Sequence, residues 1–490
     1  MKTPAPTFST DWRLKPLAAA LVASAGLLAP VLGHAQSNQE LLKELQSLKD
    51  RIQQLEDKLQ QNAAKPAPAP AAAPAVSVED FNRVSMKVEA AEDAQDASGM
   101  KGLKISGMMD PTFVFNSRQH TAGFNFLNNF NGSASSGDGY TYYNSYFGMA
   151  MLDFQKETEG GQKWRLTLAP HKSASSAYNS STDSSVSTSK TASIIHEASV
   201  SIPLDGPANK LIAGQIPDWS GYEYIWSNLQ PLISHNLLFD FTIPSYYAGA
   251  GMEMTRGKWV GKFLIGNINQ TTLSSGDKSP GLTYRADYAA SEFSGIGFAG
   301  TSTQANSVSR GFNMFEIDGY YTRGDLTLQG QIGRGQLAGA SLSGNGDNMS
   351  WTGVSGLVAY KATPRLQLVT RADYINNTSN GGGVLGSYVA SDALGNNLDS
   401  YNGFGTPMKY DGTTWAADGS SGVNRYALSV GFNYLITPNH TANSGAWNTG
   451  TWYKMELRAD GANGLVFYDA SSGGYKRDSL TLLSSLVFAF

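Results

Sequence analysis

The chain has 490 residues, of which 53 are glycine, 23 are tyrosine and only 16% are charged, a composition typical of many strands separated by turns. The mean hydropathy is −0.27, and no run of about 18 apolar residues follows the amino-terminal region, which excludes a helical membrane protein. The formal net charge of −4 argues against nucleic acid as a partner, and the absence of cysteine excludes disulfides and thiol chemistry.

Residues 1–35 predict a secretory signal peptide. Cations precede an apolar run from Leu17 to Leu32, and small residues follow it up to Ala35, where we expect cleavage. An uncleaved anchor is the alternative, although the run is short for a membrane-spanning helix.

Residues 36–62 predict an α-helical coiled coil. Apolar residues recur at alternating spacings of three and four, and opposite charges fall where parallel helices pair Glu44 with Lys49 and Arg51 with Glu56. The pattern indicates a parallel homo-oligomer and does not distinguish two strands from three. A single amphipathic helix lying on another surface is the alternative. The predicted seam is formed by Leu45, Leu48, Ile52, Leu55 and Leu59.

Two short segments follow the predicted coiled coil. Residues 63–76 are rich in alanine and proline and predict an extended spacer. Residues 77–99 predict a short helix, because Ser77 and Asp80 form a capping-box pattern before an apolar face. The sequence leaves open whether this helix lies under the next domain, enters it or extends the helical bundle.

Residues 100–490 carry sixteen strand candidates separated by turn signals, which predicts an all-β transmembrane antiparallel β-barrel of about 16 strands, with 14 and 18 as alternatives. The first two candidates are Leu103–Phe115 and Tyr140–Gln155, joined by a long connection. Long polar connections alternate with short ones, as expected when short turns lie at one end of a membrane barrel and long loops at the other. Thr437–Gly450 departs from this alternation.

Period-two patterns predict which face of each strand meets lipid. Tyr426, Leu428 and Val430 share one face, whereas Arg425 and Ser429 share the other. The last strand, Ser479–Phe490, also alternates and ends on an aromatic residue, and Phe490 resembles the terminal signal that outer-membrane barrels present to the barrel assembly machinery. The alternative is an edge strand of a soluble sheet, which would be a hazard for aggregation.

The stretch after the fifth strand carries a resemblance. Gly221–Glu223, then Ser234 ahead of Leu237–Phe239, then Ile243–Gly249 resemble the corresponding stretch of OmpL-like outer-membrane β-barrel porins. The layout of signal, coiled coil, spacer and barrel is similar to that of DcaP-like coiled-coil-bearing trimeric porins. Because Tyr246 and Tyr247 stand where those porins often have histidine, no ligand role is carried over.

The resemblance implies that the loop of residues 217–247 folds into the lumen and narrows it. The loop is unusually apolar for a surface loop and needs a surface to pack on; a neighbouring subunit is the alternative. Candidate constriction residues are Asp218, Glu223, His235 and Asp240. Strand parity places a basic wall opposite, predicting a transverse field across the pore. It consists of Arg165, Lys262, Arg285, Arg371, Arg425, Lys454 and Arg458.

We expect no enzyme, cofactor or metal site. None of the six histidines has metal-ligand spacing, and His171 and His196 are interpreted as residues of the barrel wall. The resemblance implies a homotrimeric porin for small hydrophilic solutes or ions in the outer membrane of a Gram-negative bacterium, with the coiled coil in the periplasm. The alternatives are a structural tether to peptidoglycan and a selective uptake channel for small anions or dicarboxylates.

Overall fold

The computed structural model describes residues 86–87, 101–127, 147–170, 194–269, 280–303, 311–341, 346–385, 398–419, 421–438 and 450–490. The chain divides into two compact units, Met1–Ala94 and Gln95–Phe490. In the first unit, Met86 and Lys87 are helical, and the predicted signal peptide, coiled coil and spacer lie outside the described residues. Among the described residues, no helix is both long enough and apolar enough to cross a membrane.

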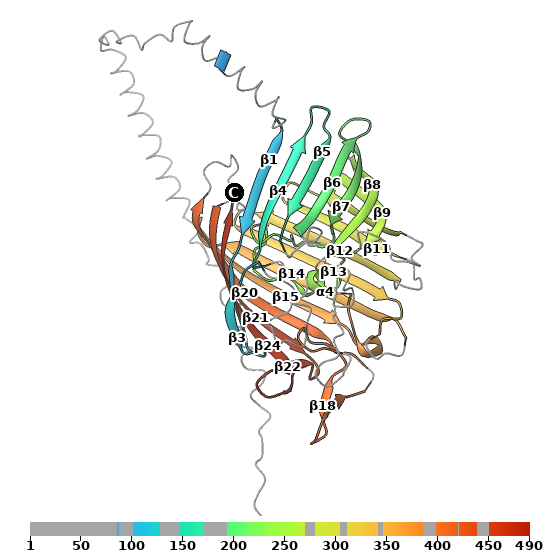
Figure 1. The fold of residues 1–490 in the computed structure, drawn as a ribbon, viewed down its shortest axis with the longest axis vertical. Helices are drawn as coiled ribbons and strands as arrows, with labels where there is room; N and C mark the ends of the chain where they lie inside the picture. Colours follow the sequence, from blue (N-terminus) through green and yellow to red (C-terminus); the bar gives the residue numbers. More distant parts are fainter. Residues whose placement is uncertain are drawn as a thin grey trace, which may run out of the picture. The chain divides into compact units, whose positions relative to one another are not determined.

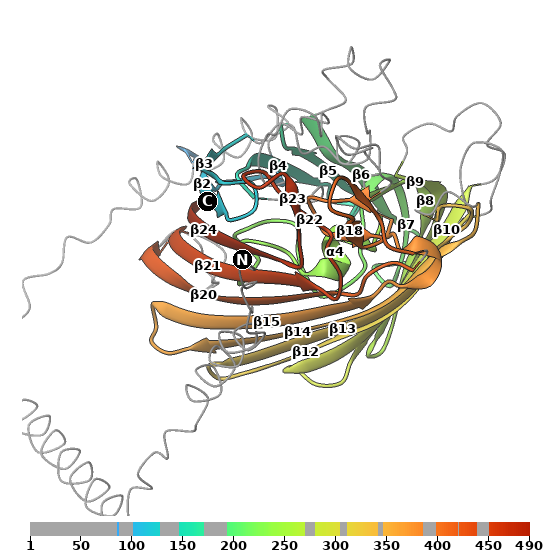
Figure 2. The same ribbon diagram turned by 90° about the horizontal axis from the view of Figure 1, so that it is seen from below.

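The second unit is an antiparallel β-barrel of sixteen strands (Figures 1 and 2). Its sheet contains eighteen segments, because β1 with β2 and β3 with β4 each form one interrupted strand. The segments are β1 (Leu103–Met109), β2 (Thr112–Asn116), β3 (Thr121–Asn125), β4 (Ala150–Glu157), β5 (Lys163–Leu168), β6 (Ile195–Pro203), β7 (Asn209–Pro217), β8 (Tyr246–Arg256), β9 (Trp259–Ile268), β10 (Gly281–Ala289), β11 (Ser294–Ser302), β12 (Phe312–Arg323), β13 (Leu326–Leu337), β14 (Met349–Lys361), β15 (Leu366–Asn376), β20 (Arg425–Pro438), β21 (Gly450–Ala462) and β24 (Asp478–Ala489).

The last strand closes the barrel. On one side β24 pairs with β21, and on the other it pairs with both halves of the first strand, so that Ala489 lies opposite Met108 and Ser485 opposite Thr112. Closure leaves the apolar strand Ser479–Phe490 with a backbone partner on each side, which removes the exposed edge that a soluble sheet would carry.

The first two strands differ from the prediction. The first strand breaks at Asp110 and Pro111, where proline has no N–H to donate to a neighbour. The second strand begins at Thr121 after a tight turn, not near residue 140, and the long excursion interrupts this strand instead of preceding it. Asp110 stabilises the interrupted region of both strands, because its carboxylate accepts hydrogen bonds from the backbone N–H groups of Gly148 (3.2 Å) and Met149 (2.6 Å).

Solvent exposure alternates along the strands as the period-two pattern predicts. In β20, Tyr426 and Tyr434 are about 40% exposed, whereas Arg425 and Ser429 are buried. The barrel therefore has an apolar outer face and a polar inner face, the reverse of a soluble protein. The exposed outer residues include Ile105, Trp164, Trp259, Ile265, Leu282, Tyr320, Ile332, Tyr360, Leu368, Leu457, Leu480, Leu486, Phe488 and Phe490.

The connections after β15 and β21 contain small elements that the sequence did not predict. Figure 1 places β18 and β22 at the end of the barrel opposite the beginning of β1. One apolar cluster joins these hairpins through Met408, Phe467 and Tyr475. The elements are η3 (Ser379–Gly381), β16 (Leu398–Asp399), β17 (Phe404–Gly405), β18 (Met408–Tyr410), β19 (Trp415–Ala417), β22 (Phe467–Asp469) and β23 (Gly474–Lys476).

Gly251→Ala tests the close approach of β8 and β9. A Cβ atom at Gly251 would lie 1.8 Å from the carbonyl oxygen of Phe263, so the two strands would have to separate. We expect the free energy of unfolding to fall by about 2 kcal/mol or more, measured by urea unfolding. Gly261→Ala lies in the same hairpin and meets nothing within 4 Å, so it serves as the control. Equal effects of the two substitutions would contradict this packing.

Candidate functional site

The chain between β7 and β8 enters the barrel. It contains the short helix α4 (Leu237–Phe241), and Figure 2 shows α4 inside the ring of strands. Asn236 caps the helix, because its side-chain oxygen accepts a hydrogen bond from the N–H of Phe239 at 2.8 Å. At the other end the Thr242 hydroxyl donates to the Leu238 carbonyl oxygen at 2.7 Å. We call residues 218–245 the inner loop.

Glycines in the wall make room for the apolar side of the inner loop. Leu238 is fully buried, and Cβ atoms at Gly333 and Gly353 would lie 3.4 and 3.0 Å from its methyl carbons. Phe241 packs edge-on against Phe404 from the long connection after β15, with ring centroids 4.7 Å apart. The helix is therefore held by shape as well as by hydrogen bonds.

Arg371 on β15 is the principal anchor of the inner loop. Its guanidinium donates to Glu223 Oε1 at 3.0 Å and to the carbonyl oxygens of Ser234 and His235 at 2.7 Å each. The Nε group donates to Asp373 on the same strand at 3.2 Å. All of these groups are buried, so an arginine of the wall satisfies backbone carbonyls that have no partner in a helix or strand.

Strand β21 supplies a second set of anchors. Glu456 accepts hydrogen bonds from the N–H groups of Ile233 and Ser234 at 2.8 Å each. Arg458 donates to the carbonyl oxygen of His235 at 2.7 Å. Lys454 donates to the carbonyl oxygen of Ser227 at 2.5 Å and also to that of Gln230. Donors and acceptors thus alternate along one strand and bind the inner loop between Ser227 and His235.

The beginning of the inner loop is held by the opposite wall. Arg285 on β10 donates to the Trp219 carbonyl oxygen at 2.9 Å and is fixed by Asp318 at 2.7 Å. The ammonium group of Lys262 lies 4.8 Å from the centre of a Trp219 ring. The Gly221 N–H donates to Glu316. The loop is therefore fixed on several sides of the lumen.

The four predicted constriction residues lie within this packing. Asp218 accepts hydrogen bonds from the Ser220 N–H (2.7 Å) and from the Tyr247 hydroxyl. His235 donates through Nε2 to the Tyr224 carbonyl oxygen at 2.9 Å and stacks on Phe239. Glu223, His235 and Asp240 are at most 8% exposed. These three side chains form the base of the loop instead of a solvent-lined constriction.

The predicted basic wall divides into two groups. Arg371, Lys454, Arg458, Arg285 and Lys262 contact the inner loop directly. Glu223 contacts Arg371 directly. The two charges therefore do not face each other across a pore, although that arrangement was predicted.

Two other wall arginines have different partners. Arg425 bonds to Asp460 at 3.1 Å and lies over the rings of Phe404 and Phe467. Arg165 bonds to Asp153 at 2.8 Å and Glu197 at 3.1 Å. Among the predicted wall residues that form an ion pair in the described part of the chain, Arg165 has the most exposed side chain, at 38%.

One face of the inner loop is open. Tyr224 and Leu229 are 59% and 37% exposed, in contrast to the buried residues that follow them. Between them, Trp226 packs edge-on against His196 of β6, with ring centroids 4.7 Å apart. A register shift where β6 meets β5 between Thr167 and Leu168 accompanies this contact. This face had no signal in the sequence, because apolar loop residues give no indication of which ones stay exposed.

Burial gives the inner loop a pH-sensitive group. It raises the pKa of Glu223 from its ordinary value of 4.5 to about 7, against the opposing effect of Arg371. Arg371 is shared with Asp373, so the positive charge does not offset the full cost of burying the Glu223 carboxylate. No group of three or more His, Asp or Glu side chains suited to a metal ion occurs among the described residues.

Comparisons with known proteins give a partial family match. Residues 73–281 match the model of a family described as a protein of unknown function, DUF3138. No curated protein matches the sequence.

Similar solved structures include OmpT, an outer membrane protein of Vibrio cholerae, at 9% identity, covering 79% of this chain and 97% of that chain with a TM-score of 0.46. An anion-selective porin from Comamonas acidovorans is 9% identical, with coverage of 79% and 99% and a TM-score of 0.44. OmpF of Salmonella typhi is 10% identical, with coverage of 79% and 97% and a TM-score of 0.44.

Arg371→Met tests the principal anchor. The substitution leaves the buried carboxylate of Glu223 without its arginine partner, and we expect the free energy of unfolding to fall by about 3–5 kcal/mol. The inner loop should also become sensitive to limited proteolysis. Arg334→Met removes an exposed arginine and should change neither measurement. A variant at Arg371 with wild-type stability and a protected loop would show that the anchor is dispensable.

Stability should fall with rising pH because of Glu223. Its pKa is higher in the folded state, so its stabilising contribution is present below pH 4.5 and is lost as the pH rises to about 7. The loss is about 1.4 kcal/mol for each unit of pKa difference. Unfolding measured from pH 4 to 8 should fall less steeply for Glu223→Gln than for the wild type. The exposed control Glu292→Gln should follow the wild type, and parallel curves for all three proteins would refute the assignment.

Proposed function

We propose that this chain is an outer-membrane porin of a Gram-negative bacterium that allows passive diffusion of small hydrophilic solutes. The observation that carries the proposal is the reversed polarity of the barrel. Side chains such as Ile265 and Ile332 are more than half exposed on the outer face, whereas Arg371, Glu456 and Arg458 are buried on the inner face. This arrangement suits a lipid exterior and a polar interior.

The inner loop supports a narrowed channel. Its buried side is packed on β14, β15 and β21, so a solute path has to pass its open face at Tyr224 and Leu229. We place the path along the exposed side chains of this face, Tyr224 and Leu229, on either side of the contact between Trp226 and His196. Asp218, Glu223, His235 and Asp240 then set the position of the loop, and Arg165 is a wall cation that stays partly exposed.

A selective uptake channel for small anions is the second candidate. The observation that favours it is the tight packing of the inner loop, which buries three of the seven predicted wall cations, Arg371, Lys454 and Arg458. A narrow path beside the remaining cations would discriminate more strongly than a wide one.

The same proposal includes the parts of the chain outside the barrel. We propose a cleaved signal peptide at residues 1–35 and a periplasmic coiled coil at residues 36–62 that joins chains in a homotrimer. Phe490 is proposed as the signal to the barrel assembly machinery. Peptidoglycan is proposed as a contact of the coiled coil, and residues 77–99 connect it to the barrel.

Single-channel recording of the refolded full chain tests the porin proposal. We expect stable conductance in groups of three steps. Tyr224→Ala should raise the conductance of each step, because it removes an exposed ring from the open face of the inner loop. Tyr360→Ala removes an equally large ring from the outer face and should leave conductance unchanged.

Correctly folded protein without conductance would contradict the proposal. Conductance that appears only after deletion of residues 36–99 would indicate a plugged barrel and support the tether.

A further inference from the structure

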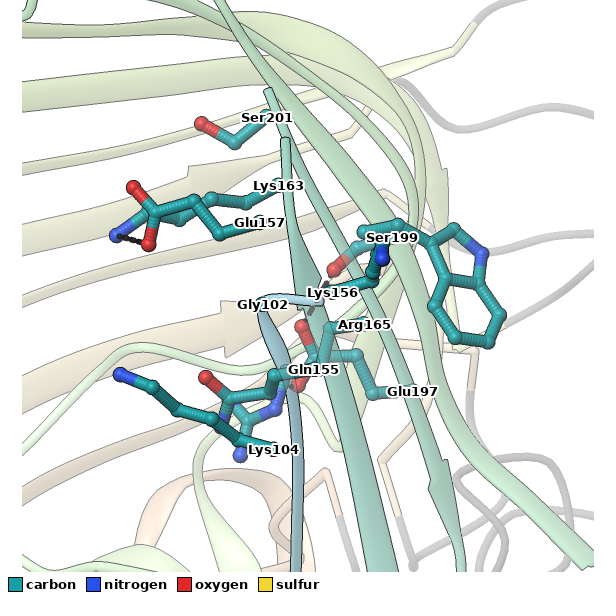
Figure 3. A pocket seen from close by; sticks show the side chains of 11 residues that line it. Gly102, Lys104, Gln155, Lys156, Glu157, Lys163, Arg165, Glu197, Ser199 and Ser201 are labelled. Atoms are coloured by element: carbon teal, nitrogen blue, oxygen red, sulfur yellow. Dashed lines mark hydrogen bonds and ion pairs between the residues drawn. The ribbon is translucent and has the colours of Figure 1, made fainter. Parts of the chain in front are cut away.

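A pocket of about 280 Å³ opens on the inner face of β1, β4, β5 and β6, at the end where short turns join the strands. Figure 3 shows that its side chains come from neighbouring strands, with Lys104, Lys163 and Arg165 around the space. None of the inner-loop contacts described above involves these three cations, so the pocket is separate from the anchors of the loop.

The pocket brings cations from two strands together on the inner face. Its inner lining includes Lys104 of β1 with Lys163 and Arg165 of β5, whereas Lys156 pairs opposite Trp164 and so lies on the outer face. The carboxylates nearby, Glu157, Glu197 and Asp153, are all paired with Lys163 or Arg165, which leaves Lys104 without a carboxylate partner among the described residues. Because the space lies between low-dielectric walls, such a cation is felt more strongly than at an open surface.

The geometry favours an anion with several oxygen atoms. Arg165 uses Nε for Asp153 and Nη1 for Glu197, and its side chain is 38% exposed. Its Nη2 group has no hydrogen-bond partner in the described part of the chain and is available to an oxyanion. Lys163 stands two residues before Arg165 on the same face of β5, about 7 Å away along the strand.

Lys104 adds a cation from a different strand. It is exposed and has no carboxylate partner within ion-pair distance among the described residues. Lys163 is paired with Glu157 only loosely, at 3.4 Å, with both side chains about half exposed. The two lysines can therefore turn toward a bound anion at little cost.

We propose that this pocket is a binding subsite for small carboxylate or phosphate anions, at the short-turn end of the lumen. The inference rests on the proposed function, since an anion would reach the subsite after passing the inner loop. It names a substrate class for the channel: small hydrophilic anions that carry at least one oxyanion group.

Titration calorimetry of the full chain folded in detergent tests the subsite without requiring conductance. The probes are succinate and inorganic phosphate, with glycerol as the neutral control. We expect saturable binding of at least one anion, weakened about tenfold in the double variant Lys104→Gln/Lys163→Gln. Lys258→Gln removes a lysine from another short turn and should bind as the wild type does.

The two anions distinguish which chemical class of ligand the subsite binds. Binding of succinate alone assigns the subsite to carboxylates, and binding of phosphate alone assigns it to phosphates. No saturable binding, or equal binding by the double variant, overturns the subsite.

Channel recordings on the same samples separate the two proposals. Conductance without anion binding overturns the subsite and supports the porin function. Anion binding without conductance supports the subsite and overturns the porin.

Discussion

The structure depends on satisfying the backbone of a loop that lies inside a closed barrel. A segment without regular hydrogen bonds cannot be buried unless its N–H and C=O groups find partners. Here the wall supplies them: Arg371 and Arg458 donate to the carbonyl oxygens near Ser234 and His235, and Glu456 accepts from the N–H groups beside them. Charged side chains on the inner face therefore serve first to hold the inner loop.

The basic residues in the wall therefore have a different role from the one predicted. A row of cations on the lumen side of strands suggests an electrostatic lining for solutes. Most of these cations instead contact the loop, and the exposed charge is found elsewhere, around Arg165 and Lys104. The buried charges fix the loop and the exposed charges remain for the solute, so the two tasks fall to different strands.

The sequence predicted the strands well where period-two alternation is strong. The closing strand, predicted at Ser479–Phe490, lies at Asp478–Ala489, and the alternation around Arg425 lies within β20, because one face of each strand is apolar. The alternation fails near Asp110, where a proline and a mid-strand excursion break the pattern, so the tight turn before Thr121 was missed.

Contacts within the candidate site were harder to predict. Parity indicates that Arg371 faces inward, but pairing with Glu223 joins residues 148 positions apart and depends on how the inner loop folds. The hairpins β18–β19 and β22–β23 are too short to produce a period. The clamp of Phe404 and Phe467 on Arg425 therefore had no signal in the sequence.

Hydrogen–deuterium exchange of the folded protein in lipid bilayers tests the docked inner loop most directly. Peptides covering residues 218–245 should exchange slowly, with protection close to that of β14 and β15, because wall side chains hold their backbone groups. Exchange of these peptides at the rate of an unstructured chain, with the strands still protected, would contradict a loop anchored inside the barrel.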